Sequence, residues 1–290
     1  MELTGLHHVT AVTAHASQNL RYYTETLGLR LVKKTVNQDD VSAYHLFYAD
    51  AEGRPGTEVT FFDWPDSPPN RAGTREIARI GLTVANRDAL KWWQDRIGGQ
   101  WTTIAGRDAI TFTDPEGQRL ALFDGREDSD QSGIQGLGPV TLVVEEAEPT
   151  ATILTNVMGF RVTGREGALT VFRSGVGEIH LEERPDLRSA RQGAGGVHHV
   201  AFRTPNAEEQ LAWRQTLHKA GVPTSGVIDR YYFKSLYFRE PNGILFEIAT
   251  DGPGFAVDES MATMGQRLSL PPFLEPRRAA IEAGLRPLAL

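Results

Sequence analysis

No cysteine occurs among the 290 residues of this chain. That absence excludes disulfide bonds, thiolate nucleophiles and cysteine ligands for metal ions, so histidine and carboxylate side chains remain as the protein ligands. It also fits a reducing compartment, and we expect a cytoplasmic protein.

Long apolar runs and blocks of basic residues are missing as well. No segment reaches the length of apolar sequence that spans a bilayer, and the first residues, Met1 to Thr4, lack the basic and apolar regions of a secretory signal. Acidic side chains outnumber basic ones, 37 to 30, which gives a formal net charge of -7. We therefore expect neither a nucleic acid nor a membrane as partner, while assembly into a homo-oligomer stays open.

What the chain does have is two matched pairs of histidines, His7-His8 and His198-His199, each opening a short apolar run. Imidazole is only intermediate in burial and needs a hydrogen-bond partner when it is enclosed, so two such pairs are hard to attribute to core packing. The pairs indicate a metal site.

Strand periodicity selects one residue from each region, because successive side chains point to opposite faces of a strand. Val200 and Phe202 are the bulky residues that would pack on a helix, so His199 faces the other way. The same alternation sends Phe246 and Ile248 to the core and turns Glu247 outward. His8 is chosen over His7 by analogy with the second pair. The candidate metal ligands are His8, His199 and Glu247; the alternative is that they are ordinary polar residues on solvated strand faces.

The sequence also repeats one pattern four times, an apolar strand followed by a helix and then two or three strands. We predict an α+β fold built from four tandem βαβββ units. The N-terminal half, residues 1–125, would contain units 6–63 and 78–124, and the C-terminal half, residues 136–250, would contain units 138–183 and 196–249. An acidic hinge at 126–135 would separate the halves, and an extension at 251–290 would follow as a lid, a dimer contact or a surface cover.

Five segments, 6–10, 44–50, 55–57, 198–202 and 229–247, occur in an order that resembles the vicinal-oxygen-chelate superfamily of glyoxalases, bleomycin-binding proteins, fosfomycin-resistance proteins and extradiol dioxygenases. More narrowly, they are similar to hydroquinone-type ring-cleaving dioxygenases. This resemblance implies two cupped mixed-sheet modules and Fe(II), with Mn(II) or another divalent ion as an alternative, bound by His8, His199 and Glu247. It implies a small aromatic diol and O2 as substrates, contacted by His7, Thr10, His198, Arg230 and Tyr237.

Each of these five contacts has a purely structural alternative, such as strand packing or a surface charge. His198 or Tyr237 would move protons during the reaction, and an aromatic pocket drawing on Phe61, Tyr232 or Phe255 would hold the ring.

Two other functions stay open at this point. A glyoxalase-like isomerase or lyase normally offers a fourth protein ligand, and Thr60 occupies that place here, which favours the dioxygenase. A metal-free small-molecule-binding protein of the same fold is the second alternative.

The ligand positions also predict which units meet in space. A βαβββ unit supplies ligands from its first and last strands, and His8 belongs to the first unit whereas His199 and Glu247 belong to the fourth. Units one and four should therefore face each other around the metal, and units two and three should pair to form a second, empty cup.

Overall fold

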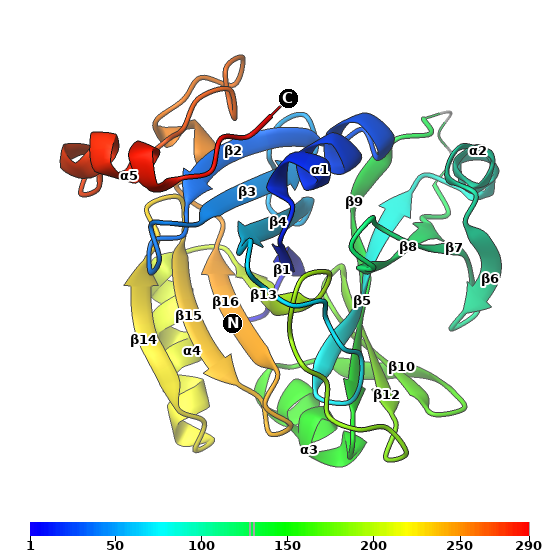
Figure 1. Ribbon diagram of the computed structural model, residues 1–290. Helices are drawn as coiled ribbons and strands as arrows, with labels where there is room; N and C mark the ends of the chain where they lie inside the picture. The colour runs from blue at the N-terminus through cyan, green and yellow to red at the C-terminus, as the bar shows by residue number, and fades with distance from the viewer. Residues whose placement is uncertain (128, 130, 290) are drawn as a thin grey trace.

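The computed structural model describes residues 1–127, 129 and 131–289, and it contains four βαβββ units (Figure 1). The first consists of β1 (Leu6–Thr13), α1 (Ala16–Arg21) continued by a π-helical turn (Tyr22–Thr26), β2 (Arg30–Val36), β3 (Tyr44–Ala49) and β4 (Glu58–Asp63). The second consists of β5 (Glu76–Val84), α2 (Arg87–Ile97), β6 (Gln100–Ile104), β7 (Arg107–Thr113) and β8 (Arg119–Asp124).

The third unit consists of β9 (Ile134–Val144), α3 (Ala147–Thr152) with a π-helical turn (Ile153–Val157), β10 (Arg161–Glu166), β11 (Leu169–Ser174) and β12 (Gly177–Glu183). The fourth consists of β13 (Val197–Thr204), α4 (Ala207–Lys219), β14 (Thr224–Asp229), β15 (Lys234–Arg239) and β16 (Leu245–Thr250). Two 3-10 turns (Phe255–Val257 and Glu275–Arg277) and α5 (Arg278–Gly284) follow. The predicted α+β fold with four units is confirmed.

The strands form two eight-stranded sheets that each combine distant parts of the chain. The first sheet has the order β14-β15-β16-β13-β1-β4-β3-β2, and the second has the order β10-β11-β12-β9-β5-β8-β7-β6. The first sheet joins units one and four through the antiparallel pair β1–β13, and the second joins units two and three through β5–β9. The predicted pairing of the units is therefore confirmed.

Two strands, β6 and β14, have little of the apolar alternation that marks the other strands. Both lie at the edge of a sheet, where only one side is hydrogen-bonded and much of the strand stays accessible. Edge strands carry fewer apolar side chains, so the alternation that marks the inner strands is weak in them.

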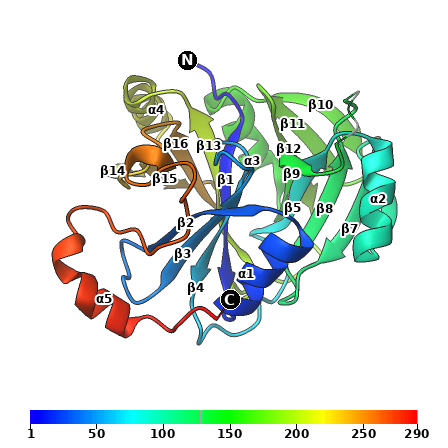
Figure 2. The same cartoon turned by 90° about the horizontal axis from the view of Figure 1, so that it is seen from above.

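The helices pack against one face of each sheet (Figure 2). In that view α1 and α3 lie between the two sheets, while α2 and α4 lie on the far sides. The apolar residues that face the helices, among them Val9, Phe202 and Phe246, are fully buried in one continuous core. Among the described residues, no helix combines the length and the apolar character needed to cross a membrane.

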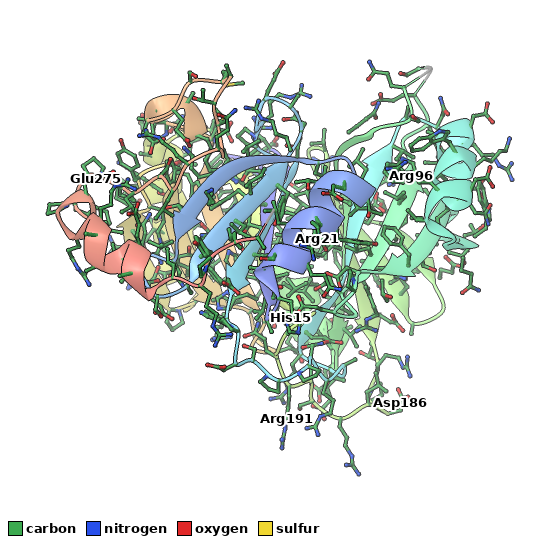
Figure 3. The ribbon with its side chains drawn as sticks, turned by 45° about the horizontal axis from the view of Figure 1, so that its top comes forward. His15, Arg21, Arg96, Asp186, Arg191 and Glu275 are labelled. Atoms are coloured by element: carbon green, nitrogen blue, oxygen red, sulfur yellow. The ribbon has the colours of Figure 1, made fainter. Side chains whose placement is uncertain are left out.

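The segments between units also contact each other. Residues 69–74 pair with residues 189–194 at single bridges, including Arg71 with Arg191, at the lower end of the view in Figure 3. The predicted hinge at 126–135 includes Asp128 and Asp130, which lie outside the described residues, and β9 already begins at Ile134. Whether the halves 1–125 and 136–250 are separate domains stays a prediction.

The C-terminal extension covers the edge strand β2. Leu268 forms a bridge to Lys34, and the buried ammonium group of Lys33 contacts the carboxylates of Asp258, at 2.7 Å, and Glu259. In the structure this segment covers the edge of the first sheet, while a lid and a dimer contact stay predictions.

A buried carboxylate in the β7–β8 turn gives a test of the contact between the sheets. Asp114 accepts hydrogen bonds from the backbone N–H groups of Glu116 and Gln118 and from the hydroxyl of Tyr23, which belongs to the other sheet's helix. Burial raises the pKa of Asp114 to about 6. The folded state therefore holds this proton more tightly than the unfolded state, and the stability contributed by the protonated form is lost as the pH rises from about 4 to about 6.

Asn is uncharged at every pH, so we expect Asp114→Asn to be more stable relative to wild type at pH 7 than at pH 4. The difference in free energy of unfolding between variant and wild type should rise by about 1–3 kcal/mol over that interval. Urea titrations at both pH values, with a chelator present, measure this difference. An unchanged difference would show that Asp114 does not titrate in this way.

Candidate metal centre

Three side chains converge on the inner face of the first sheet because of strand register. His8 on β1 lies opposite Ala201 on β13, and Ala201 lies opposite Glu247 on β16. His199 precedes Ala201 by two residues, so it points to the same face. The orientation predicted from the alternation is thus observed for His199 and Glu247, and His8, chosen by analogy, points to the same face.

The three side chains are close enough to share one ion. His8 Nε2 lies 3.2 Å from His199 Nε2 and 3.2 Å from Glu247 Oε2, and His199 Nε2 lies 2.9 Å from Glu247 Oε2. Metal bonds to nitrogen and oxygen of about 2.1 Å place two ligands at a right angle about 3.0 Å apart. Neither oxygen of Glu247 has a hydrogen bond with proper geometry to any described group. The donor set and its spacing therefore fit a divalent metal ion.

All three are buried, with exposures of 1% for His8, 2% for His199 and 0% for Glu247, so they do not lie on a solvated strand face. Burial alone would raise the pKa of Glu247, but His8 and His199 outweigh it and hold the pKa well below its usual range. Burial lowers the pKa of His199. An ionised carboxylate beside a neutral imidazole is the protonation state that binds metal.

His7 supports His8 from behind. His7 Nδ1 lies 2.9 Å from His8 Nδ1, and His7 Nε2 lies 3.1 Å from the carbonyl oxygen of Thr250. A carbonyl can only accept, so His7 Nε2 carries the proton, His7 Nδ1 accepts, and His8 Nδ1 donates. This fixes the tautomer of His8 in which Nε2 has a free lone pair. Burial and the nearby His8 lower the pKa of His7 to about 3, so His7 is neutral.

His198 holds the same position beside His199. Its Nδ1 lies 2.7 Å from His199 Nδ1, and its ring packs near Phe62 and Trp64. His198 lines a second cavity together with Arg75 and Arg239. The structure therefore places His7 and His198 behind the candidate ligands, and the proton-transfer role of His198 stays a prediction.

Thr10 also lies beside the candidate ligands, and it does not line the cavity. Its hydroxyl lies 2.8 Å from that of Thr60, which in turn lies 2.9 Å from His45 Nε2. Thr60 is the position at which a fourth protein ligand was considered, and here its oxygen is engaged in this chain of hydrogen bonds.

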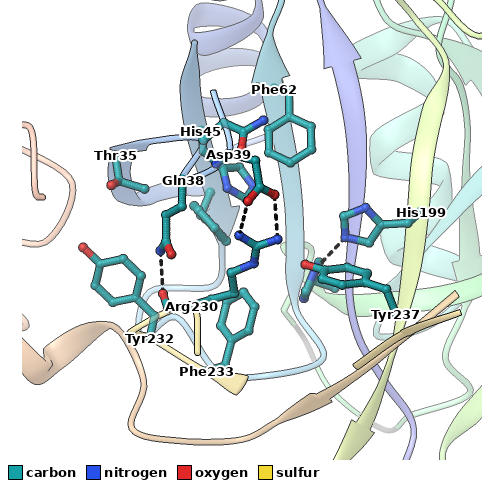
Figure 4. Close-up of a pocket in the computed structure, with 13 residues that line it drawn as sticks. Thr35, Gln38, Asp39, His45, Phe62, His199, Arg230, Tyr232, Phe233 and Tyr237 are labelled. Carbon is teal, nitrogen blue, oxygen red and sulfur yellow. Dashed lines mark hydrogen bonds and ion pairs between the residues drawn. The ribbon is translucent and has the colours of Figure 1, made fainter. Parts of the chain in front are cut away.

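A cavity of about 430 Å³, mouth included, opens from the candidate ligands between units one and four (Figure 4). The residues that line it are His8, Thr35, Asn37, Gln38, Asp39, His45, Phe47, Phe62, His199, Arg230, Tyr232, Phe233 and Tyr237. Of the predicted contacts, Arg230 and Tyr237 thus lie in the cavity.

The side chains of Arg230 and Tyr237 contact each other in the cavity. The Arg230 guanidinium lies over the Tyr237 ring, 5.5 Å from its centroid, and pairs with both carboxylate oxygens of Asp39, at 3.0 and 2.7 Å (Figure 4). Gln38 donates to the carbonyl oxygen of Arg230 at 2.7 Å. Burial raises the pKa of Tyr237 above its usual range, so the phenol keeps its proton at neutral pH.

The expected aromatic lining was only partly right. Tyr232 lines the cavity, but Phe61 is buried on the outer face of β4 against Tyr23, and Phe255 packs behind Phe47 and Tyr232. The rings that sequence reasoning missed, Phe47, Phe62 and Phe233, share the inner face with the ligands. Alternation from Thr60 would have indicated Phe62, whereas Phe47 and Phe233 could be found only by knowing which segments are neighbours in space.

A second group of possible ligands, His7, His8 and Glu58, lies nearby. Burial and the nearby Asp50 and Glu247 raise the pKa of Glu58 well above its usual range, so this carboxyl group is protonated and is a poor ligand. The group containing Glu247 is therefore the better candidate.

Comparisons with known proteins agree with the fold. The family model of the Glyoxalase/Bleomycin resistance protein/Dioxygenase superfamily matches residues 5–122 and 136–248. The chain belongs to this superfamily. It is 50% identical to the "Putative ring-cleaving dioxygenase MhqA" of Bacillus subtilis (strain 168), over 99% of this chain and 100% of that protein.

Two further relatives extend the comparison. A crystal structure named "putative dioxygenase from Bacillus subtilis subsp. subtilis str. 168" aligns with a TM-score of 0.93 and 38% identity, covering 99% of this chain and 98% of the other. A chlorohydroquinone/hydroquinone 1,2-dioxygenase from Sphingobium indicum is 28% identical over 93% of this chain and 92% of its own.

The two carboxyl groups provide a matched test of the ligand assignment. We expect Glu247→Gln to lose bound metal while the fold persists, because a neutral amide is a weak ligand. Glu58→Gln should keep a full equivalent of metal, because Gln has the shape and charge of the protonated Glu58. Metal analysis after anaerobic loading and desalting measures both; retention by Glu247→Gln, or loss from Glu58→Gln alone, would reverse the assignment.

His7 should matter for affinity without being a ligand. We expect His7→Phe, which fits beside the ring of Phe233, to weaken metal binding about 10–100-fold because His8 loses the group that fixes its tautomer. His15→Phe, at an exposed histidine before α1 (Figure 3), is the control and should leave the affinity unchanged. Competition with a fluorescent chelator gives both dissociation constants; equal affinities for the two variants would contradict the supporting role of His7.

Proposed function

We propose that the protein is an Fe(II)-dependent ring-cleaving dioxygenase that acts on a hydroquinone-type aromatic diol and O2. The observation that carries this proposal is the buried group of two histidines and one carboxylate at the end of an aromatic cavity. This donor set with open positions is typical of non-haem Fe(II) oxygenases. The names of the relatives support the same reaction class.

Different residues of the chain would bind the metal ion and the aromatic ring. His8, His199 and Glu247 would hold the ion, and Fe(II) when bound would supply the electronic path between the aromatic ring and O2. Phe47, Phe62 and Phe233 would hold the ring and exclude water. The result would be insertion of both oxygen atoms with cleavage next to a ring hydroxyl group.

Two cavity residues would handle charge and protons. The guanidinium of Arg230 is fixed over Tyr237 and would stabilise negative charge on a phenolate or on reduced oxygen. The phenol of Tyr237 keeps its proton at neutral pH and would donate it as oxygen is reduced, since its ring lies 5.7 Å from the ring of His199.

Thr60 separates this proposal from a glyoxalase-like reaction. A hydroxyl oxygen that already bonds Thr10 and His45 does not offer a fourth metal ligand, so the cavity side of the site stays free for a substrate and O2.

We expect Fe(II)-loaded protein to consume O2 with para-diols, and to do so with a higher kcat/KM than with any catechol. Oxygen-electrode assays with substituted hydroquinones and catechols measure this, with Mn(II)-loaded and Glu247→Gln protein as controls. A catechol far above every hydroquinone would indicate an ordinary extradiol enzyme. Conversion of a methylglyoxal–glutathione adduct without O2 uptake would indicate the isomerase.

A further inference from the structure

Two polar side chains, His45 and Thr35, lie on the wall of the cavity that β3 and β2 form. They are direct cross-strand neighbours on β3 and β2, and both line the cavity. In the sheet order β13-β1-β4-β3-β2, β3 lies two strands from β1 and β2 lies three, so Thr35 lies farther from the candidate ligands than His45 does. Figure 4 shows Thr35 and Tyr232 on the opposite side of the cavity from His199 and Tyr237.

The ring of His45 is held in one orientation. Its Nε2 is 2.9 Å from the hydroxyl of Thr60, and the ring lies between Phe47 and Phe62, with centroids at 3.9 and 4.5 Å. Among the described residues its Nδ1 has no hydrogen-bond partner. Burial lowers the pKa of His45 well below its usual range, so the ring is neutral and offers both a donor and an acceptor nitrogen.

Thr35 supplies the second observation. Its side chain is 2% exposed, and its hydroxyl oxygen has no hydrogen-bond partner among the described residues. Buried hydroxyl groups are nearly always paired, so an unpaired one on a cavity wall points to a polar group of a ligand. Tyr232, which lies beside Thr35, donates its phenol proton to Asp258 at 2.9 Å, so its oxygen can only accept from Thr35. Among the described residues no group donates to the Thr35 oxygen, which is left to accept a hydrogen bond from a ligand.

We propose that His45 and Thr35 form the site that binds the distal hydroxyl group of a para-diol, an inference that rests on the proposed function. A para-diol can place one oxygen at His8, His199 and Glu247 and the other across the ring at this wall. An ortho-diol directs both oxygens toward the ligands and leaves His45 Nδ1 and the Thr35 hydroxyl without a partner. The two residues would thus select hydroquinones over catechols.

Anaerobic binding tests this assignment without relying on turnover. Hydroquinone and phenol differ only in the distal hydroxyl group, and their dissociation constants are measured on Fe(II)-loaded protein under argon. Wild type should bind hydroquinone about tenfold or more tighter than phenol. His45→Phe and Thr35→Val should each lose most of that preference by weakening hydroquinone, with phenol affinity unchanged. Thr111→Val, on β7 of the second sheet, is the control and should match wild type.

The same measurements can overturn the proposal. Equal affinities of wild type for the two compounds, or variants that keep the full preference, would do so. Thr35→Val conserves shape, so it decides the matter if His45→Phe fails to fold. If wild type prefers hydroquinone but consumes no O2 with it, the proposed function is wrong and the binding site is still supported. If both variants turn over substrate with unchanged selectivity, only this inference is wrong.

Discussion

The candidate site depends on one piece of backbone pairing, the antiparallel contact between β1 and β13. His8 and His199 are 191 residues apart in the chain, and only this contact brings their Nε2 atoms to 3.2 Å. The register matters as much as the contact, because a shift by one residue would turn His8 or His199 to the helix-covered face. The parallel pair β13–β16 then adds Glu247 from the same unit as His199.

The second sheet repeats this architecture with different chemistry. In unit four, Glu247 lies opposite Ala201. By strand register, the corresponding residue is His180, opposite Thr141, in unit three, and Ala121, opposite Gly81, in unit two. His180 is buried, but its Nε2 lies 2.6 Å from Glu178, which also binds Arg107 and Arg173. Within the described residues the two candidate ligand groups both lie in the first sheet. The second sheet thus offers no comparable ligand group within the described residues, and Glu178 is engaged in ion pairs with Arg107, Arg173 and His180.

Much of this was predictable from the sequence, and the limits have physical reasons. Alternation within a strand gave the facing of His199 and Glu247, and the distribution of ligands gave the pairing of units one and four. Phe61 was wrongly expected in the cavity, because alternation along β4 from Thr60, which the sequence analysis placed beside the metal, turns Phe61 to the opposite face. The His7–Thr250 contact and the orphan hydroxyl of Thr35 depend on register between strands, which no local pattern reveals.

The central claim is that one divalent ion is held jointly by the first and fourth units. Anomalous diffraction at the iron edge, from crystals of the anaerobically Fe(II)-loaded full chain, tests this most directly. The account predicts a single strong peak within bonding distance of His8 Nε2, His199 Nε2 and a carboxylate oxygen of Glu247. A peak beside His7 and Glu58, or a peak beside His180 in the second sheet, would contradict it. The absence of any peak from protein that had been loaded with Fe(II) would contradict it too.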